Sequence, residues 1–555
     1  MTKISKVTLS LILCLTLCFP VAAANLDAGT EYLGSYTVEN EGGITAHTSD
    51  PYALSVSAEA GGSEYIDTFD DFVREIVRRM EEREEHIVLK YSRDSVVDDG
   101  FFDTLFERIF QHTGDPRGGD YLRYQYSNYK CSYEGFKRSG ICYYTFTFSL
   151  KYYTNTEQEA AVDRAVEKIV QIIKQNYTTD YEKTIAIYRF VTNNTEYDNE
   201  NLNNSSYKLK YSAYAALLNK TAVCQGYANL IYRLALELGI DCRIISGIGN
   251  GGAHAWNIIR GDDGRYYLFD ATWDAQRIRA DREYAYIFCG SEEFDDHIAD
   301  ESFLTAEFTS RYPISTDSYK LKDVGHISDG AFRINRYATS VQSGEKSGIC
   351  LVCGAKSERI SIPYVHAEDV YKNYVSKSWS EDGINFVSSN GLMGDTGNGD
   401  FKQTGKMTRS MFVTVLYRLA GSPTVLSASP FTDLDPAQSW YHNAVVWAYE
   451  NGIVTGTSAA TFAPNAEVTR EQIATFLYRY TVNYLKVDVS GVKNDISSFP
   501  DAGSVGSYAK DALAWANGVG LIKGQSSGDK SFLAPKNDAT REEVAVIIFR
   551  FCTAE

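Results

Sequence analysis

The segment AVCQGYANLIYRLALELGI, residues 222–240, is the feature that most constrains how this chain folds. Its apolar residues recur at helical spacing, which predicts an amphipathic helix that begins near Cys224. The two runs that follow, AWNII after His254 and RYYLFD up to Asp270, are rich in aromatic and β-branched residues and predict strands. A cysteine at a helix start is thus followed, within fifty residues, by a histidine and an aspartate on neighbouring strands.

This order of residues suits nucleophilic acyl chemistry. A thiol at a helix N-terminus faces unpaired N–H groups and the positive end of the helix dipole, and both favour the reactive thiolate. An imidazole held by a carboxylate can take the thiol proton and later return it to a leaving amine. Cys224, His254 and Asp270 are therefore the predicted nucleophile, general base and orienting carboxylate.

The region from about Tyr181 to Gly290 resembles the transglutaminase-like superfamily in its bacterial secreted branch. The resemblance rests on YEKTIAIYRFVTNNTEYD, on the segment around Cys224, and on HAWNIIRGDDGRYYLFDATWD. It implies a papain-like α+β core and a Cys-His-Asp triad at the three residues named above. Catalysis by such a triad is expected to require no cofactor.

The oxyanion hole is less constrained by the sequence. The backbone N–H of Cys224 is a natural donor. The resemblance also implies a side-chain donor upstream, and Tyr197, Tyr211 and Tyr214 all remain candidates. Gln225 is interpreted equally well as an oxyanion donor or as an ordinary residue of the first helical turn.

A chain of 555 residues is too long for one hydrophobic core, and composition and motifs divide it into several parts. The predicted organisation is multidomain: an α+β N-terminal domain, the α+β core, a small β module and a mainly α-helical repeat region. The predicted bounds are 1–24 (signal peptide), 25–62 (flexible leader), 63–160 (N-terminal domain), 161–322 (catalytic domain), 323–368 (β module), and 369–425, 426–490 and 491–555 (three repeats).

Residues 1–24 have the lysines, short apolar run and small residues of a secretory signal, with cleavage expected after Ala24. No later run is long and apolar enough to predict a membrane span. The formal net charge of −18 argues against nucleic acid or an anionic membrane as partner and suits an extracellular protein.

Cysteine spacing suggests two further features. Cys131 and Cys142 flank YEGFKRSGI, and both a hairpin disulfide and a pair of free thiols fit this spacing. Later in the chain a C-x2-C pair followed by Gly354 has the form of a zinc knuckle. A structural zinc site is predicted with four ligands, and the alternative is a disulfide or free pair; the ligands are His326, Cys350, Cys353 and His366.

From about Asp369 the chain repeats itself three times. The lines MTRSMFVTVLYRLAG, VTREQIATFLYRYT and ATREEVAVIIFRFC each place a Thr-Arg pair at a predicted helix start. These units resemble S-layer homology (SLH) modules, which bind pyruvylated secondary cell-wall polymer. The resemblance assigns polymer contact to Arg409, Arg470 and Arg541, and a guanidinium beside free N–H groups suits an anionic sugar.

The first unit lacks the FxD signature that opens the other two, so a weaker groove is expected there. The tryptophans of the repeats are interpreted as packing residues; they are Trp379, either Trp440 or Trp447, and Trp515.

These observations predict a cysteine enzyme on the surface of a Gram-positive-type bacterium, held on the wall by its repeats. It is expected to act on peptide or Gln amide bonds through a thioester, which is then resolved by water or by an amine. The alternative is a non-catalytic adhesin or S-layer-associated protein that uses the same fold for binding.

Overall fold

The computed structural model describes residues 30–41, 65–98, 100–327, 332–350, 352–435, 437–492 and 494–554. The chain forms two compact units. The first comprises residues up to 109 together with 127–151, and the second comprises 110–126 and everything from 152 onward. The predicted signal peptide lies outside the described residues. Among those described, no helix is both long enough and apolar enough to cross a bilayer.

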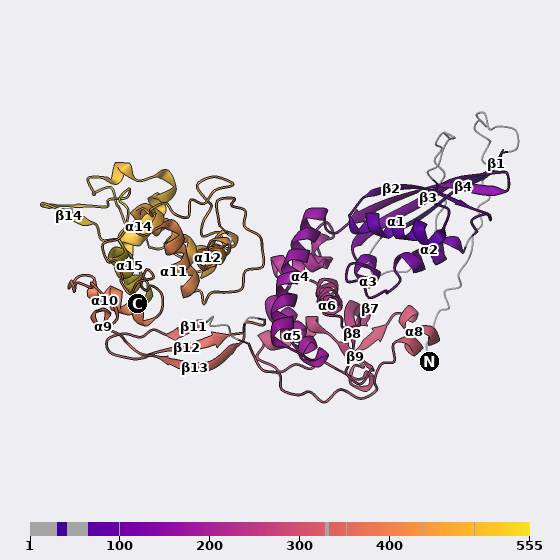
Figure 1. Ribbon diagram of the computed structural model, residues 1–555, viewed down its shortest axis with the longest axis horizontal. Coiled ribbons are helices and arrows are strands. Elements are labelled where there is room, and N and C mark those ends of the chain that lie inside the picture. The colour runs from indigo at the N-terminus through magenta and orange to yellow at the C-terminus, as the bar shows by residue number, and fades with distance from the viewer. Residues whose placement is uncertain are drawn as a thin grey trace. The chain divides into compact units, whose positions relative to one another are not determined.

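The first unit is an antiparallel sheet of order β1-β3-β4-β2, with α1 and α2 against one face (Figure 1). Phe72 and Ile76 of α1 are fully buried, and Phe72 stacks on Tyr91 of β2 with ring centroids 4.6 Å apart. The elements are β1 (Thr30–Glu41), α1 (Phe69–Glu81), β2 (His86–Arg93), α2 (Phe101–Ile109), β3 (Tyr126–Arg138) and β4 (Ile141–Tyr152).

Strand β1 corrects the prediction of a flexible leader over residues 25–62. It pairs antiparallel with β3, from Thr30 opposite Arg138 to Glu41 opposite Asn128. Tyr36 packs its ring on Phe102, with centroids 5.4 Å apart. The pairing partner is about one hundred residues away, so the Gly- and Ser-containing composition of this segment gave no local sign of it.

Cys131 and Cys142, on β3 and β4, are buried free thiols rather than a disulfide. The predicted N-terminal domain also included residues 110–126, which belong to the second unit. Asp120 of this segment forms a buried ion pair with Arg243, with its carboxylate oxygens 2.6 and 2.9 Å from the guanidinium nitrogens.

In the second unit, helices surround a sheet of order β10-β7-β8-β9. Helix α6 packs on β8, and the side chain of Asn257 in that strand donates to the Ala228 carbonyl of the helix at 3.1 Å. The elements of this core are α3 (Gly119–Arg123), α4 (Thr156–Asn176), α5 (Asp180–Asn194), β5 (Glu196–Tyr197), β6 (Thr221–Ala222), α6 (Cys224–Glu237), β7 (Cys242–Gly249), β8 (Gly252–Arg260), β9 (Tyr266–Phe269), α7 (Ala271–Arg279), β10 (His297–Ala299) and α8 (Ala306–Arg311).

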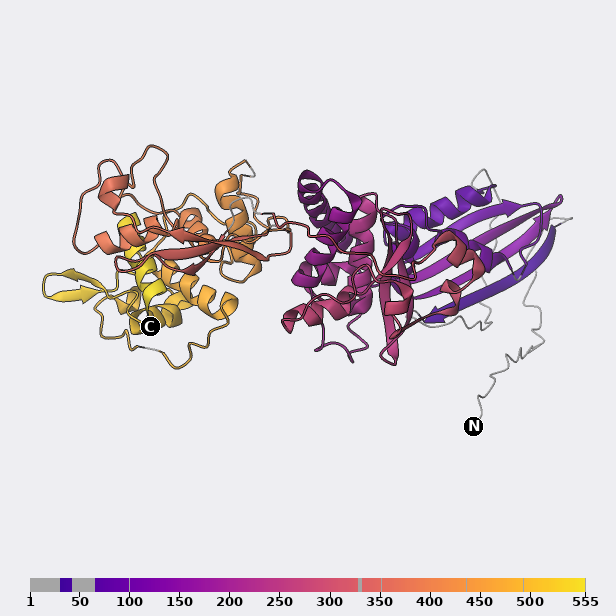
Figure 2. The same ribbon diagram turned by 90° about the horizontal axis from the view of Figure 1, so that it is seen from below.

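A three-stranded antiparallel sheet follows, formed by β11 (Phe332–Arg336), β12 (Gly344–Ile349) and β13 (Lys356–Ile362). The remaining residues form helix pairs and one hairpin, which is yellow in Figure 2 and extends away from the helices. Their elements are α9 (Ala367–Val370), α10 (Glu381–Ser389), α11 (Arg409–Leu419), α12 (Ser439–Glu450), α13 (Arg470–Arg479), α14 (Lys510–Gly518), β14 (Gln525–Ser527), β15 (Lys530–Phe532) and α15 (Arg541–Thr553).

The segments before α11, α13 and α15 meet in a closed ring of backbone hydrogen bonds. Met407 N–H donates to the Ala539 carbonyl at 3.0 Å, Ala539 N–H to Val468 at 3.0 Å, and Val468 N–H to Met407 at 2.8 Å. The three repeated lines therefore occupy equivalent places around a pseudo-threefold axis, although the first differs in its opening sequence.

Candidate functional site

Cys224 is the first residue of α6, as the sequence predicted. The residue before it, Val223, has extended backbone (φ −92°, ψ 176°) and a hydrocarbon side chain that cannot cap the helix. The sulfur therefore lies where the first N–H groups of a helix have no intrahelical acceptor and the helix dipole is positive. Cys224 is 8% exposed, so its side chain is largely shielded from solvent.

Gly226 explains how the chain packs around this helix start. A Cβ at Gly226 would lie 2.7 Å from the Cβ of Ala222 and 3.0 Å from the carbonyl oxygens of Lys210 and Ser212. The first turn of α6 thus rests directly on the backbone of residues 210–212. Asn229, one turn further on, donates its side-chain N–H to the Tyr211 carbonyl at 3.0 Å.

His254 lies on β8, opposite Gly247 of β7, and faces α6. Its Nε2 is 2.8 Å from Asp270 Oδ2, and Cys224 lies close enough to act on the charge of its ring. Burial by itself would lower the pKa of His254. The interactions with Asp270 and Cys224 outweigh that effect and raise the pKa to about 10, so the imidazole is held as a cation at neutral pH.

Asp270 follows the last residue of β9 and is the N-cap of α7. Its Oδ1 accepts from the N–H groups of Thr272 at 2.8 Å and Trp273 at 3.2 Å. Although burial favours the neutral acid, hydrogen bonds from His254 and His297 outweigh it and hold the pKa of this fully buried carboxyl below its usual value. Asp270 is therefore a fixed anion that orients the imidazole.

His297 is a member of the site that sequence reasoning missed. It lies on β10, opposite Gly249, and its Nε2 is 3.2 Å from the same Oδ2 of Asp270 that binds His254. Its Nδ1 is 2.7 Å from Asp296 Oδ1, and its ring stacks on Phe294 with centroids 3.9 Å apart. The only signal was a histidine in an Asp-Asp-His run, within a tail of weak pattern.

Aromatic rings and glycines complete the surroundings of His254. Trp273 stacks on the imidazole with centroids 5.2 Å apart, and Trp256 lies at 6.0 Å. A Cβ at Gly249 would lie 2.9 Å from Cδ2 of His254, so the strand turn before the histidine needs glycine for this close approach.

A surface groove of about 310 Å³ begins at Trp273. Its other lining residues come from α7 and from the turns on either side of the site: Asn250, Gln276, Arg277, Ala280, Arg282 and Tyr286.

Two of the three tyrosines considered as oxyanion donors lie near the sulfur. Burial, with the charges of Cys224 and Asp270 adding to it, raises the pKa of Tyr197 to about 12. Burial and Cys224 also raise the pKa of Tyr211. Both hydroxyls remain protonated donors at neutral pH. The side-chain amide of Gln225 donates to the Tyr124 carbonyl at 2.8 Å, which engages it in packing.

The three arginines singled out in the repeats occupy equivalent places. Each is the first residue of its helix, follows a capping threonine, and sends Nε to a carbonyl of the next repeat around the ring. The acceptors are Phe462 for Arg409 (2.9 Å), Leu533 for Arg470 (2.9 Å) and Phe401 for Arg541 (2.7 Å). Burial lowers the pKa of all three, so a bound anion would relieve the cost of the buried charge.

The packing interpretation of the tryptophans holds for Trp515 and, of the two alternatives in the second repeat, for Trp447, but not for Trp379. Trp447 and Trp515 are buried, whereas Trp379 is 52% and Trp440 46% exposed. These two and Tyr508, which is 52% exposed, stand at corresponding places just before or at the start of the first helix of each repeat.

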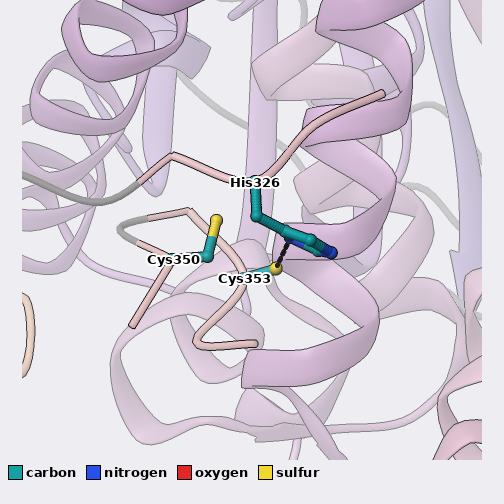
Figure 3. Close-up of side chains that lie close together, drawn as sticks. All are labelled: His326, Cys350 and Cys353. Atoms are coloured by element: carbon teal, nitrogen blue, oxygen red, sulfur yellow. Dashed lines mark hydrogen bonds between the residues drawn. The ribbon is translucent and has the colours of Figure 1, made fainter. Parts of the chain in front are cut away.

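The structure brings three of the four predicted metal ligands together. His326, Cys350 and Cys353 place their ligand atoms within 4.8 Å of one another (Figure 3). His366 is not part of this group, which corrects the prediction of four protein ligands. It is the N-cap residue of α9, and its ring packs against Tyr364.

Comparisons with known proteins agree with this architecture. A model of the transglutaminase-like superfamily matches residues 167–271, and a model of the S-layer homology domain matches residues 430–474 and 498–545. The first match ends just after Asp270 and includes Cys224 and His254.

Three relatives share part of the chain. An endoglucanase from Bacillus sp. (strain KSM-635) is 32% identical over 31% of this chain and 17% of its own length. The surface-layer 125 kDa protein of Lysinibacillus sphaericus is 30% identical over 31% of this chain and 14% of its own. The kyphoscoliosis peptidase of Mus musculus is 25% identical over 21% of this chain and 19% of its own.

The chain thus spans less than a fifth of each of these relatives. Together, the two family matches and the mixed α and β architecture show that this chain carries a transglutaminase-like core and S-layer homology domains.

Proposed function

We propose that this protein is a secreted, wall-held cysteine enzyme that cleaves or exchanges amide bonds through a thioester on Cys224. The observation that carries the proposal is the grouping of Cys224, His254 and Asp270, in which His254 Nε2 lies 2.8 Å from Asp270 Oδ2 and Cys224 lies close enough to act on the charge of the imidazole. Its nucleophile stands at an uncapped helix start, and its carboxylate is fully buried.

The charges of these residues dictate the first half of the reaction. The Cys224 thiolate attacks the amide carbon, a C–S bond forms, and the carbonyl oxygen takes the negative charge. The His254 cation then donates its proton to the nitrogen, the C–N bond breaks, and the amine leaves. Asp270 stabilises the cation before this transfer and orients the neutral ring after it.

The second half reverses these roles. Neutral His254 takes a proton from water or from an amine, whose oxygen or nitrogen attacks the thioester carbon. The C–S bond breaks, the acid or new amide departs, and the thiolate and imidazolium are restored. We favour hydrolysis, with the substrate a peptide or protein, and treat amine transfer as the other outcome.

Two features support stabilisation of the oxyanion. The backbone N–H groups at the start of α6 point out of the helix towards the nucleophile. The protonated hydroxyls of Tyr197 and Tyr211 lie close enough to Cys224 for its charge to act on them, and we assign the side-chain donor to one of these two.

We further propose that Arg409, Arg470 and Arg541 bind the pyruvylated secondary polymer of the cell wall. Each guanidinium is nearly buried and uses Nε within the protein. One terminal nitrogen of Arg541 also donates to the Gly394 carbonyl, and one of Arg470 lies 4.0 Å from Glu543, so the proposal assigns the carboxylate to the remaining terminal nitrogens. Export through the signal at residues 1–24 would deliver the enzyme to that polymer.

The decisive test compares the mature chain with Cys224→Ala in a mass-spectrometric assay. Both proteins meet a mixture of Gln-containing peptides and a labelled primary amine. Cleavage that requires Cys224 establishes a peptidase, and label incorporation that requires Cys224 establishes a transglutaminase. Cys289→Ala is the matched control, because burial raises the pKa of that thiol to about 12 and keeps it unreactive.

Iodoacetamide labelling near neutral pH separates a wrong substrate from a wrong proposal. Rapid labelling of Cys224 without turnover means that the nucleophile is competent and the peptides are unsuitable. If Cys224 labels no faster than Cys289, the enzymatic proposal fails, and a binding protein built on the same core takes its place.

A further inference from the structure

A cluster of sulfur and nitrogen ligands lies outside the catalytic site. His326 stands in the segment that follows the core, Cys350 directly after β12, and Cys353 three residues later. Figure 3 shows the three side chains grouped together, with a dashed line that joins His326 to Cys353. The Nδ1 of His326 is 3.4 Å from the sulfur of Cys353, and every pair of ligand atoms lies within 4.8 Å.

The backbone around the two cysteines is folded into a tight turn. Cys350 N–H donates to the Ala355 carbonyl at 2.8 Å, and Gly354 N–H returns to the Cys350 carbonyl at 2.8 Å. Gly354 has φ +71°, which a residue with a side chain adopts only with strain. This turn brings two sulfurs, separated by two residues, to the same side of the chain.

The turn also supplies donors to the sulfurs. The N–H groups of Cys353 and Ile327 lie near the sulfur of Cys350, and the N–H of Ala355 lies near that of Cys353. Such N–H groups stabilise a sulfur that carries negative charge, and they are the supporting contacts that metal-bound thiolates need. A disulfide sulfur, which is neutral and a weak acceptor, gains far less from them.

From this geometry we propose that Cys350, Cys353 and His326 bind one zinc ion, with the fourth coordination position open to solvent. Ligand atoms about 2.3 Å (sulfur) and 2.0 Å (nitrogen) from one tetrahedral ion lie roughly 3.5 Å apart. The separation of 3.4 Å between Nδ1 and sulfur therefore needs little adjustment. Both cysteines are buried while His326 is exposed, so the open position faces water.

The charges and ligand types agree with this ion. Two thiolates and one neutral imidazole balance a divalent cation, and soft sulfur ligands favour zinc over calcium or magnesium. Without the metal, two adjacent buried thiolates would repel each other. Arg189 of α5 lies close enough to act on the charge of Cys353, and it also donates to the Val324 carbonyl beside His326.

The position of the site indicates its role. His326 ends the segment that leaves the core, whereas both cysteines belong to the turn between β12 and β13. A shared ion would clip that segment to the small sheet and close the loop between residues 326 and 350. The expected consequence is stability that depends on metal, independent of the chemistry at Cys224.

The test measures bound metal on the full mature chain carrying Cys224→Ala, which removes the reactive thiol. The protein is reduced, loaded with zinc, desalted and analysed by mass spectrometry of metals. We expect one zinc per chain, and loading with cobalt should give the visible absorption of a tetrahedral thiolate site. Cys353→Ser should lose the metal, and His326→Ala should weaken binding at least tenfold.

His366→Ala is the matched control and should retain one zinc per chain, since that histidine stands apart from the cluster. Chelation should lower the midpoint of thermal unfolding of the parent and leave that of Cys353→Ser unchanged. The proposal is overturned if the reduced parent holds no zinc, if His366→Ala loses it as Cys353→Ser does, or if the native chain carries a Cys350–Cys353 disulfide that excludes the metal.

Discussion

A single carboxylate organises the candidate catalytic site. Asp270 gives one oxygen to two imidazoles and the other to the first N–H groups of α7. The N-terminus of α7 thus stabilises the negative charge of Asp270. That charge in turn stabilises the protonated form of His254. The pH dependence of the reaction should therefore be sensitive to this residue.

Asp270→Asn should lower the basic limb of the activity profile. The imidazole of His254 keeps its proton up to a pKa of about 10, although burial opposes this, because Asp270 and Cys224 stabilise the cation. Without the carboxylate charge, the lowering effect of burial on the pKa of His254 is less opposed. The pKa that sets the basic limb should therefore fall towards the ordinary histidine range. We expect turnover at pH 8 to drop by roughly 10²-fold or more, as measured by kcat/KM across pH.

The raised pKa of His254 also predicts how the stability of the fold depends on pH. The charged imidazole contributes to the free energy of unfolding below about pH 6.5, the unfolded value, and that contribution is lost as the pH rises through about 10. The free energy of unfolding of the parent, measured with urea, should therefore fall over this pH window. That of Asp270→Asn should change less. An equal loss in both would contradict the assignment.

His297 is expected to be a positioning residue rather than a reacting one. His297→Leu removes a hydrogen-bond donor to Asp270. The carboxylate should then stabilise the His254 cation more strongly, and the basic limb of the activity profile should move to higher pH. His297→Gln keeps an N–H donor and should restore the parent profile. If both variants lose activity with the profile unmoved, His297 serves packing alone.

Individual site residues could be predicted from the sequence where a reactive residue type lies within a strong local pattern. Cys224, His254 and Asp270 could be named because each lies in a strong local pattern. His297 could not, because only the pairing of β10 with β7 brings it to Asp270. His366 was chosen by spacing after Cys353, but the chain turns into α9 and carries it away from the sulfurs.

Among the elements, α6 depends most on a single small residue. Gly226→Ala would place a methyl group against Ala222 and the carbonyls of Lys210 and Ser212, so the helix start must shift. We expect a loss of about 1–3 kcal/mol in the free energy of unfolding and slower labelling of Cys224. Gly325→Ala is the control, since a Cβ there meets no atom within 4 Å and should change neither measurement.

Elements with a strong internal pattern could be predicted, and those that depend on distant partners could not. The helix expected to begin near Cys224 is α6, and the strands expected after His254 and up to Asp270 are β8 and β9. Strand β1 has polar and small residues and gains its structure only from β3. The difference is physical, because an edge strand needs one apolar face at most and its hydrogen bonds come from another part of the chain.

On the scale of the whole chain, wall attachment and catalysis should be separable. Replacing Arg409, Arg470 and Arg541 together by Lys keeps the charge but removes the Nε–H that holds each carbonyl and the planar fork that matches a carboxylate. Sedimentation with purified wall polymer should show binding at least tenfold weaker, with Cys224-dependent activity unchanged.

Arg550→Lys provides the control for attachment. Arg550 lies in the last turn of α15, remote from the helix start, and donates to the Leu521 carbonyl at 3.2 Å. Binding that falls equally in this variant would mean that general positive charge, rather than the three placed arginines, holds the protein on the wall.

The hydrogen-bonded ring formed by Met407, Val468 and Ala539 limits how this architecture can evolve. A ring closed by three members has no end at which a unit can be added, and removing one member breaks two of the three hydrogen bonds. The divergent first repeat is therefore needed to close the ring, whether or not it binds a sugar. The residues of its groove can vary, whereas its backbone at the ring cannot. We therefore expect selection to constrain the number of repeats more strongly than the residues that line each groove.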